Sequence, residues 1–278
     1  MQAQNLSSEH PSMADIVPER KLIKKPSLLL LMLESRVLAE FAAMTLSHSW
    51  LKGAPVGDGH AVMVIPGFLA SDLSTKPLRK YLRKLGYKAY GWDRGYNLGQ
   101  PGDPAHQVNK DPEGVKRLEQ IQMKHGGKIS LIGWSLGGIY ARELARQAPH
   151  LVRQVITMGS PFNGNLKATH VSRVYEFLRQ VDLDEMDPDF RELIRTPPPV
   201  PTSAIYSKTD GVVAWQNCRQ DEESEFCENI EVVCSHIGFG FNPLVHWILA
   251  ERLAQTEEEW QKMDRSIIPA FAGKFGLA

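Results

Sequence analysis

The sequence Gly133-Trp134-Ser135-Leu136-Gly137 matches the pattern Gly-x-Ser-x-Gly. An apolar run precedes it and a helix-forming stretch follows it, which is the strand–turn–helix context of a nucleophilic serine. The turn is sharp, so glycine is needed two residues to either side, where larger side chains would collide. The start of the following helix directs free N–H groups and its positive dipole end at the reacting oxygen. We therefore expect Ser135 to be a nucleophile, the alternative being a glycine-rich turn that is tight only for packing.

A serine hydroxyl needs a base, and the base needs a carboxylate that orients it. After a strand–turn–helix serine, the acid and then the histidine follow along the chain. Of the nine histidines, His236 and His246 lie late enough. His236 follows a predicted strand directly and lies in a loop, whereas His246 lies within a predicted helix. We expect His236 to be the base, with His246 as the alternative.

The expected acid is Asp210, which follows a predicted strand and precedes His236 by 26 residues. Its alternative role is that of a turn aspartate, because Asp-Gly is common in β-turns. Other acidic residues that could compete cluster between residues 162 and 200 and are typical of a solvated face: Asp182, Asp184, Asp187 and Asp189.

A tetrahedral intermediate carries negative charge on one oxygen, which two backbone N–H groups usually bind. We expect one of them from Leu136, the residue after the serine, and the other from Phe68 in the loop after the first strand. A plain β-turn is the alternative for that loop. Apolar side chains near these groups are the expected substrate contacts: Leu69, Trp92, Trp134 and Phe162.

Alternating apolar runs and helical stretches predict the elements that position these residues. Strands are expected at 61–65, 87–92, 128–132, 155–158, 204–206 and 230–234, and helices at 77–85, 112–125, 138–148 and 243–253. Strands separated by single helices indicate an α/β fold, with a mostly parallel, doubly wound sheet and helices on both faces. Residues 162–200 interrupt the alternation of strands and helices at the edge of the sheet where ligands bind, so we expect a helical cap there. The alternative is an insertion that only packs against the domain.

The N-terminal residues 1–26 are polar and proline-rich with a basic cluster, and are expected to be a flexible arm before a single domain, 27–278. Residues 28–50 predict a partly buried amphipathic helix, because Glu34, Arg36 and Glu40 interrupt its apolar run well short of the ~20 residues that span a membrane. Peripheral contact with a membrane surface is the alternative. The first apolar run lacks a secretory cleavage site, so a cytoplasmic location is expected.

The composition excludes several function classes. Basic and acidic residues both number 32, so the chain has no net positive charge for binding nucleic acid. No HExxH or paired-cysteine spacing occurs, and we expect neither metal nor cofactor. Three cysteines share one stretch and are expected to be reduced thiols; a Cys218–Cys227 or Cys218–Cys234 disulfide is the alternative. Nothing in the sequence indicates an oligomeric state.

Several blocks together resemble bacterial lipase/esterase-like α/β hydrolases. They are Pro66-Gly67-Phe68, residues 91–99, Gly133-Trp134-Ser135-Leu136-Gly137-Gly138, Gly159-Ser160-Pro161-Phe162, residues 207–213, and Ser235-His236 followed by Asn242-Pro243. The resemblance implies the α/β-hydrolase fold, a Ser135–Asp210–His236 triad, Phe68 and Leu136 as oxyanion donors, and ester hydrolysis without a cofactor. A helix from Leu28 stands where larger members have early antiparallel strands, as in smaller lipase-like members.

The expected function is therefore that of a serine carboxylic-ester hydrolase, of esterase or lipase type, with an acyl-enzyme intermediate. Short- to medium-chain apolar acyl esters, either small molecules or lipids, are the expected substrates. An acyltransferase with the same triad is one alternative, because water exclusion decides the acceptor. A non-catalytic binding protein of the same fold is the other.

Overall fold

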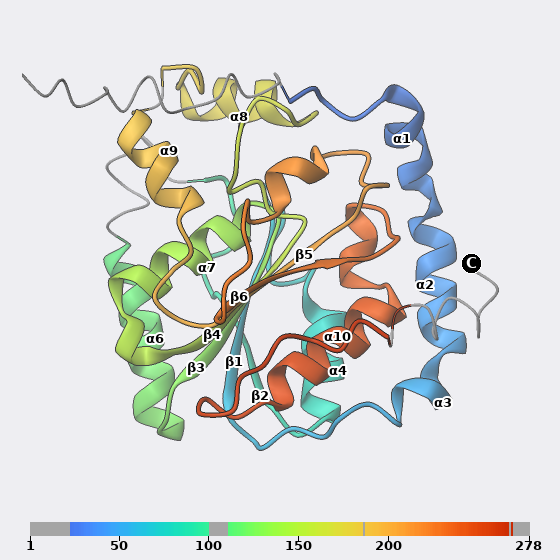
Figure 1. The fold of residues 1–278 in the computed structure, drawn as a ribbon, viewed down its shortest axis with the longest axis vertical. Coiled ribbons are helices and arrows are strands. Elements are labelled where there is room, and N and C mark those ends of the chain that lie inside the picture. Colours follow the sequence, from blue (N-terminus) through green and yellow to red (C-terminus); the bar gives the residue numbers. More distant parts are fainter. Residues whose placement is uncertain (1–22, 100–110, 186, 267, 269–278) are drawn as a thin grey trace, which may run out of the picture.

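The computed structural model describes residues 23–99, 111–185, 187–266 and 268. In this part of the chain, one sheet of six parallel strands has the order β2-β1-β3-β4-β5-β6 (Figure 1). The strands are β1 (Ala61–Ile65), β2 (Lys88–Gly91), β3 (Ile129–Trp134), β4 (Val152–Met158), β5 (Thr202–Tyr206) and β6 (Cys227–Glu231). Most of the expected arm, residues 1–22, lies outside the described residues.

Helices cover both faces of this sheet. They are α4 (Lys76–Lys84), α6 (Pro112–His125), α7 (Leu136–Gln147), α8 (Ser172–Arg179), α9 (Pro188–Arg195) and α10 (Pro243–Ala254). Figure 1 shows α6 and α7 on one side and α4 and α10 on the other. Both faces of the sheet are therefore buried. The inner strands are continuous apolar runs, because successive side chains point alternately toward the two helical layers. In β1, Val62 and Val64 pack with α4 and α10, whereas Met63 and Ile65 pack with α6 and α7.

The strand order reverses between β1 and β3, since β2 lies to one side of β1 and β3 to the other. Ligands bind at such a point, outside the carboxyl ends of the strands, in open α/β sheets. Ser135 and the loop after β1 both lie there. The predicted strands and helices are present, with shifted ends.

The largest shift is in β6, which ends at Glu231, whereas the predicted strand covered residues 230–234. The prediction missed its start because Glu228 and Asn229 are polar. Glu228 is fully buried and forms a 2.8 Å ion pair with Arg252, which is also fully buried. A paired charge can therefore occupy a fully buried position in a strand. The predicted helix 138–148 begins instead at Leu136, directly after Ser135.

The predicted N-terminal helix is broken into short pieces: α1 (Leu28–Met32), the 3-10 turn η2 (Leu33–Arg36), α2 (Val37–Leu46) and α3 (His48–Leu51). This segment lies outside the helical layer that contains α10 (Figure 1). Among the described residues, no helix has the length and apolarity to cross a membrane.

Residues 162–200 carry α8 and α9, which Figure 1 shows beyond one end of the sheet. Arg142 on α7 is fully buried and donates to the carbonyl oxygens of Ile194, Arg195 and Thr196 at 2.9–3.2 Å. A cation at a helix C-terminus satisfies free carbonyls and complements the dipole. Arg142 therefore ties the end of α9 to α7. Cys218, Cys227 and Cys234 are buried and unpaired, as predicted.

Candidate active site

Ser135 occupies a strained turn between β3 and α7, with φ 53° and ψ −125°. Such a conformation is costly for a residue with a side chain and persists only where its surroundings enforce it. A Cβ on Gly133 would lie 2.3 Å from Gly138 Cα, and one on Gly137 would lie 2.4 Å from the carbonyl oxygen of Ile65. Both glycines are thus required by close backbone approach. In the described part of the chain, the Ser135 hydroxyl makes no hydrogen bond, and the residue lines a cavity.

His236 and Asp210 form a buried pair, with 2.6 Å between Nδ1 and Oδ2. The other carboxylate oxygen of Asp210 accepts from the N–H groups of Val212 and Val213, each at 2.8 Å. Burial opposes a charged imidazole, but attraction to Asp210, the hydrogen bond to it and the charge of Glu34 outweigh burial and raise the pKa of His236. The pair can therefore take up a proton and stabilise the resulting charge.

Ser135 and His236 both lie against the carboxyl end of β4. The N–H of Ser135 donates to the carbonyl of Met158 at 2.8 Å. A Cβ on the next residue, Gly159, would lie 3.2 Å from Nδ1 of His236. The indole of Trp134 donates to the carbonyl of His236 at 3.1 Å. The serine and the imidazole are not hydrogen-bonded to each other; in active sites such bonds are often long until substrate binds.

Three charged side chains from the N-terminal segment hold the loops that carry the acid and the base. Glu34 accepts from the N–H groups of Gly211 (2.8 Å), His236 (2.9 Å) and Ile237 (3.1 Å). These contacts were not predicted, because in the sequence a lone glutamate only interrupts an apolar run.

The other two charged side chains, Glu40 and Arg36, bind the same two loops. Glu40 accepts from the N–H and the hydroxyl of Ser235, at 2.8 and 2.5 Å. Arg36 donates to the carbonyl and the hydroxyl of Thr209, at 2.5 and 2.9 Å. The signal that could have revealed them is their isolation, since residues 27–47 hold no other charge.

The loop after β1 lies against the serine: a Cβ on Gly67 would be 3.8 Å from Ser135 Oγ. Within the described residues, the N–H groups of Phe68 and Leu136 donate to no other protein group. Asn97, which is fully buried, braces this loop. Its side chain donates to the carbonyl of Pro66 at 2.8 Å, and its backbone exchanges two hydrogen bonds with the same loop.

An apolar cavity of about 80 Å³ opens beside Ser135. The residues around it include Phe68, Leu136, Leu166, Tyr175, Phe190 and Ile194, so both helices of the 162–200 segment contribute. The four expected substrate contacts do not line it. Trp92 packs against Tyr140, and Trp134 holds His236. Phe162 is fully buried beneath the guanidinium of Arg142, and Leu69 is exposed.

Residues 60–198, half of the chain, match the family model described as alpha/beta hydrolase fold. The chain belongs to this family. Two curated relatives are named "Serine hydrolase BPHL": the mouse protein is 33% identical over 134 residues and the human protein 34% over 133. Each match covers 45% of this chain, with 44% of the mouse and 43% of the human protein, so it spans less than half of either relative.

Solved structures agree on the fold of this α/β hydrolase. Lipase B of Aspergillus fumigatus aligns with a TM-score of 0.55 at 16% identity, covering 78% of this chain and 60% of the lipase. The mature lipase BlEst2 of Bacillus licheniformis aligns with a TM-score of 0.53 at 16% identity, covering 73% of this chain and 95% of the lipase. At this identity the likeness concerns the fold alone.

A second Asp–His–Ser array lies at the opposite end of the sheet. His60 bonds to Asp58 through Nδ1 and to the Ser130 hydroxyl through Nε2, the latter at 2.8 Å. Ser130 is fully buried near the start of β3, and it borders none of the described cavities. In an α/β hydrolase, ligands bind at the carboxyl ends of the strands. This array therefore serves packing.

His246, the alternative base, is also unsuitable. It is fully buried in α10, stacks on Tyr81 and bonds through Nε2 to the carbonyl of Gly240 at 3.0 Å. Burial lowers its pKa to about 4. His246 is therefore a neutral core histidine.

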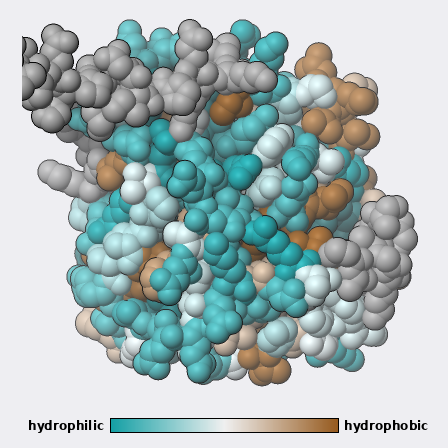
Figure 2. Space-filling model, viewed as in Figure 1, coloured by the Kyte–Doolittle hydropathy of each residue, from teal (hydrophilic) through white to brown (hydrophobic). Residues whose placement is uncertain are grey.

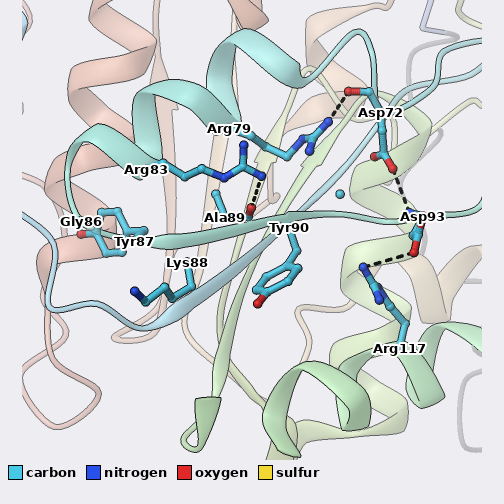
Figure 3. A pocket seen from close by; sticks show the side chains of 11 residues that line it. Asp72, Arg79, Arg83, Gly86, Tyr87, Lys88, Ala89, Tyr90, Asp93 and Arg117 are labelled. Atoms are coloured by element: carbon cyan, nitrogen blue, oxygen red, sulfur yellow. Dashed lines mark hydrogen bonds and ion pairs between the residues drawn. The ribbon is translucent and has the colours of Figure 1, made fainter. Parts of the chain in front are cut away.

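A larger hollow of about 660 Å³ lies at the β2 edge of the sheet (Figure 3). Its three arginines already have partners. Arg79 and Arg83 donate to the carbonyls of Asp72 and Ala89, and Arg117 pairs with Asp93 at 3.4 Å. The carboxylate of Asp72 in turn accepts from the N–H of Asp93 at 2.9 Å. The described residues that line the hollow include no serine, cysteine or histidine, so the size of a hollow does not locate the site. In the described ranges, no group of three or more His, Cys, Asp or Glu side chains is arranged to hold a metal ion.

Proposed function

We propose that this protein is a serine hydrolase that cleaves carboxylic esters through an acyl-enzyme. One observation carries the proposal: the strained Ser135 faces an apolar cavity beside two free N–H groups, and a buried His236–Asp210 pair lies at the same end of the sheet. The family supplies the fold, and the names of the two relatives agree with the chemistry.

In the proposed reaction, His236 removes the hydroxyl proton as Ser135 attacks the ester carbonyl. Asp210 holds the imidazole by Nδ1 and stabilises its charged form. The N–H groups of Phe68 and Leu136 bind the negative oxygen of the tetrahedral intermediate. The imidazolium returns the proton to the alcohol as it leaves. Water, deprotonated by His236, then attacks the acyl-enzyme and releases the acid.

The cavity supports a short apolar acyl group. Its volume of about 80 Å³ is well below the roughly 300–1,000 Å³ of pockets that enclose drug-sized ligands. The described side chains around it are mostly apolar and none is charged, so a charged acyl group would lose its hydration there without an opposite charge to compensate. Residues 162–200 act as the cap of this cavity in our proposal, since α8 and α9 form one of its walls.

The test is turnover of p-nitrophenyl acetate, butyrate, octanoate and palmitate by the full chain, with Ser135→Ala alongside. We expect the highest kcat/KM for acetate or butyrate and no enzymatic turnover by the variant. A flat, negligible response to all four esters would overturn the substrate class. Adding methanol and identifying products separates hydrolysis from acyl transfer.

A further inference from the structure

The N-terminal segment is amphipathic, but its charged side chains face the protein and its apolar side chains face outward. Between Ser27 and Ser47 the only charged residues are Glu34, Arg36 and Glu40. All three turn inward and bind the loops after β5 and β6. The outward face of α1, η2 and α2 is consequently uncharged, whereas surface helices usually place charge outward.

Large apolar side chains occupy this outward face. Six of them are 53–82% exposed: Leu28, Leu29, Met32, Leu38, Phe41 and Leu46. Ile237, the neighbour of His236, is 44% exposed, and Phe41 contacts Phe241 from the same loop region. Figure 2 shows apolar atoms gathered along the edge of the molecule where Figure 1 places α1 and α2. Contiguous patches of this kind mark interaction sites.

Positive charge adjoins the start of this face. A hollow of about 940 Å³ is lined by Lys24, Lys25, Lys208 and Arg219, together with Leu30 of α1. Its two carboxylates are engaged: Asp210 binds His236, and Asp221 pairs with Arg195 at 2.9 Å. Lys208 also pairs with Glu231 at 2.8 Å. The positive charges of Lys24, Lys25 and Arg219 are therefore in excess over the carboxylates that line the hollow. The sequence adds Arg20 and Lys21 just upstream, with no acid between residues 20 and 33.

We propose that the outward face of residues 28–46 binds the surface of an anionic lipid bilayer. The apolar side chains enter the boundary between headgroups and acyl chains, as in interfacial helices. The basic residues at its N-terminal end contact lipid phosphates, since anionic leaflets attract basic clusters next to a membrane-bound segment. A second copy of the chain is a poorer occupant, because a two-fold contact would present the same uncharged face, which offers no negative partner for the basic end.

Binding of this kind does not require catalysis, and it can be tested with intact lipids. The probe is co-sedimentation of the full-length Ser135→Ala variant with vesicles of phosphatidylcholine alone or with 30% phosphatidylglycerol. We expect binding to the anionic vesicles, weaker binding to the neutral ones, and a loss of affinity as salt rises. Absence of binding to both kinds of vesicle would overturn the proposal.

The face itself is tested by Leu29→Ser/Leu38→Ser. The matched control is Leu73→Ser/Met123→Ser, since Leu73 and Met123 are 73% and 79% exposed and lie outside the N-terminal segment. We expect about ten-fold weaker vesicle binding for the first pair and no change for the control. Equal binding by both pairs would overturn the proposal.

Two further outcomes would assign the face to another occupant. A concentration-dependent dimer in sedimentation equilibrium that Leu29→Ser/Leu38→Ser abolishes would assign it to a second copy. Vesicle binding that appears only after removal of residues 269–278 would assign it to that segment. If neither outcome is observed and the protein binds anionic vesicles, the result supports a lipid bilayer as the partner of this face.

Discussion

The carboxylate of Glu34 accepts a hydrogen bond from the backbone N–H of His236 at 2.9 Å. The same oxygen accepts from Gly211, the residue after Asp210, at 2.8 Å. One buried side chain from the N-terminal segment therefore fixes the relative position of the two loops that carry the acid and the base. It also adds negative charge near the imidazole, which contributes to the raised pKa of His236.

The Glu34→Gln variant should shift the pH profile of ester hydrolysis. The base acts as neutral imidazole, so activity rises as pH rises through the pKa of His236. Removing the charge of Glu34 lowers that pKa, and the acid limb of the kcat/KM profile should move to lower pH. The amide also cannot accept all three N–H groups, so urea unfolding should show a loss of about 2 kcal/mol.

The matched control for this variant is Glu258→Gln, at an exposed position with no contact to these loops. Its profile should coincide with that of the wild type. If Glu34→Gln only destabilises the protein and leaves the acid limb in place, Glu34 has a structural role alone.

The Asp210→Asn variant should lose most of its activity while it stays folded. Oδ1 accepts from the N–H groups of Val212 and Val213. The asparagine oxygen will therefore take that place and turn its NH2 group toward His236. The imidazole is then held in the tautomer that cannot accept the serine proton, and kcat should fall on the order of 10³–10⁴-fold. Steady-state kinetics with a circular-dichroism check measures this; a fall of less than ten-fold would contradict the role of Asp210.

The Asn97→Ala variant should impair the transition state more than substrate binding. Its amide donates to the buried carbonyl of Pro66, and the variant leaves that oxygen unpaired and the loop less constrained. Oxyanion contacts form only in the transition state, so kcat should fall with little change in KM. Tyr96→Ala is the control, since Tyr96 is the exposed neighbour. A rise in KM alone would place Asn97 in substrate binding.

The Leu166→Ala variant should shift the acyl preference toward longer chains. Leu166 lines the cavity beside Ser135 and is half-buried, so its truncation enlarges the cavity at a modest cost in stability. Leu178→Ala on α8 is the control, because Leu178 does not line the cavity. The ratio of kcat/KM for octanoate to that for butyrate should rise in the first variant alone. An unchanged ratio would mean that the acyl group binds elsewhere.

The sequence predicted the parts of this molecule that depend on local pattern. The turn around Ser135 was predictable because close backbone approach demands glycine at 133 and 137. The succession of strands and helices along the chain followed from alternating apolar and helical segments, and it placed Asp210 and His236 in loops that follow strands. The start of β6 was missed because the burial of Glu228 depends on Arg252, 24 residues further on.

Contacts between distant segments were beyond the reach of sequence patterns. The carboxylate of Glu34 meets a loop about 200 residues later, and no spacing encodes that distance. The expected substrate side chains were chosen for apolarity near the serine, yet Trp92 and Phe162 point into the core. One wall of the cavity comes from α8 and α9, and the docking of α9 depends on the bonds between Arg142 and the carbonyls at the end of that helix.

Labelling by a fluorophosphonate is the most direct test of Ser135 as the nucleophile, because the reagent forms a bond only with an activated serine. The wild-type protein should be labelled once, on the peptide that contains Ser135. Ser130→Ala, which removes the serine of the other Asp–His–Ser array, should be labelled as the wild type is, and Ser135→Ala should not be labelled at all. Labelling that persists in Ser135→Ala, or that maps to Ser130 or another serine, would show that Ser135 is not the nucleophile.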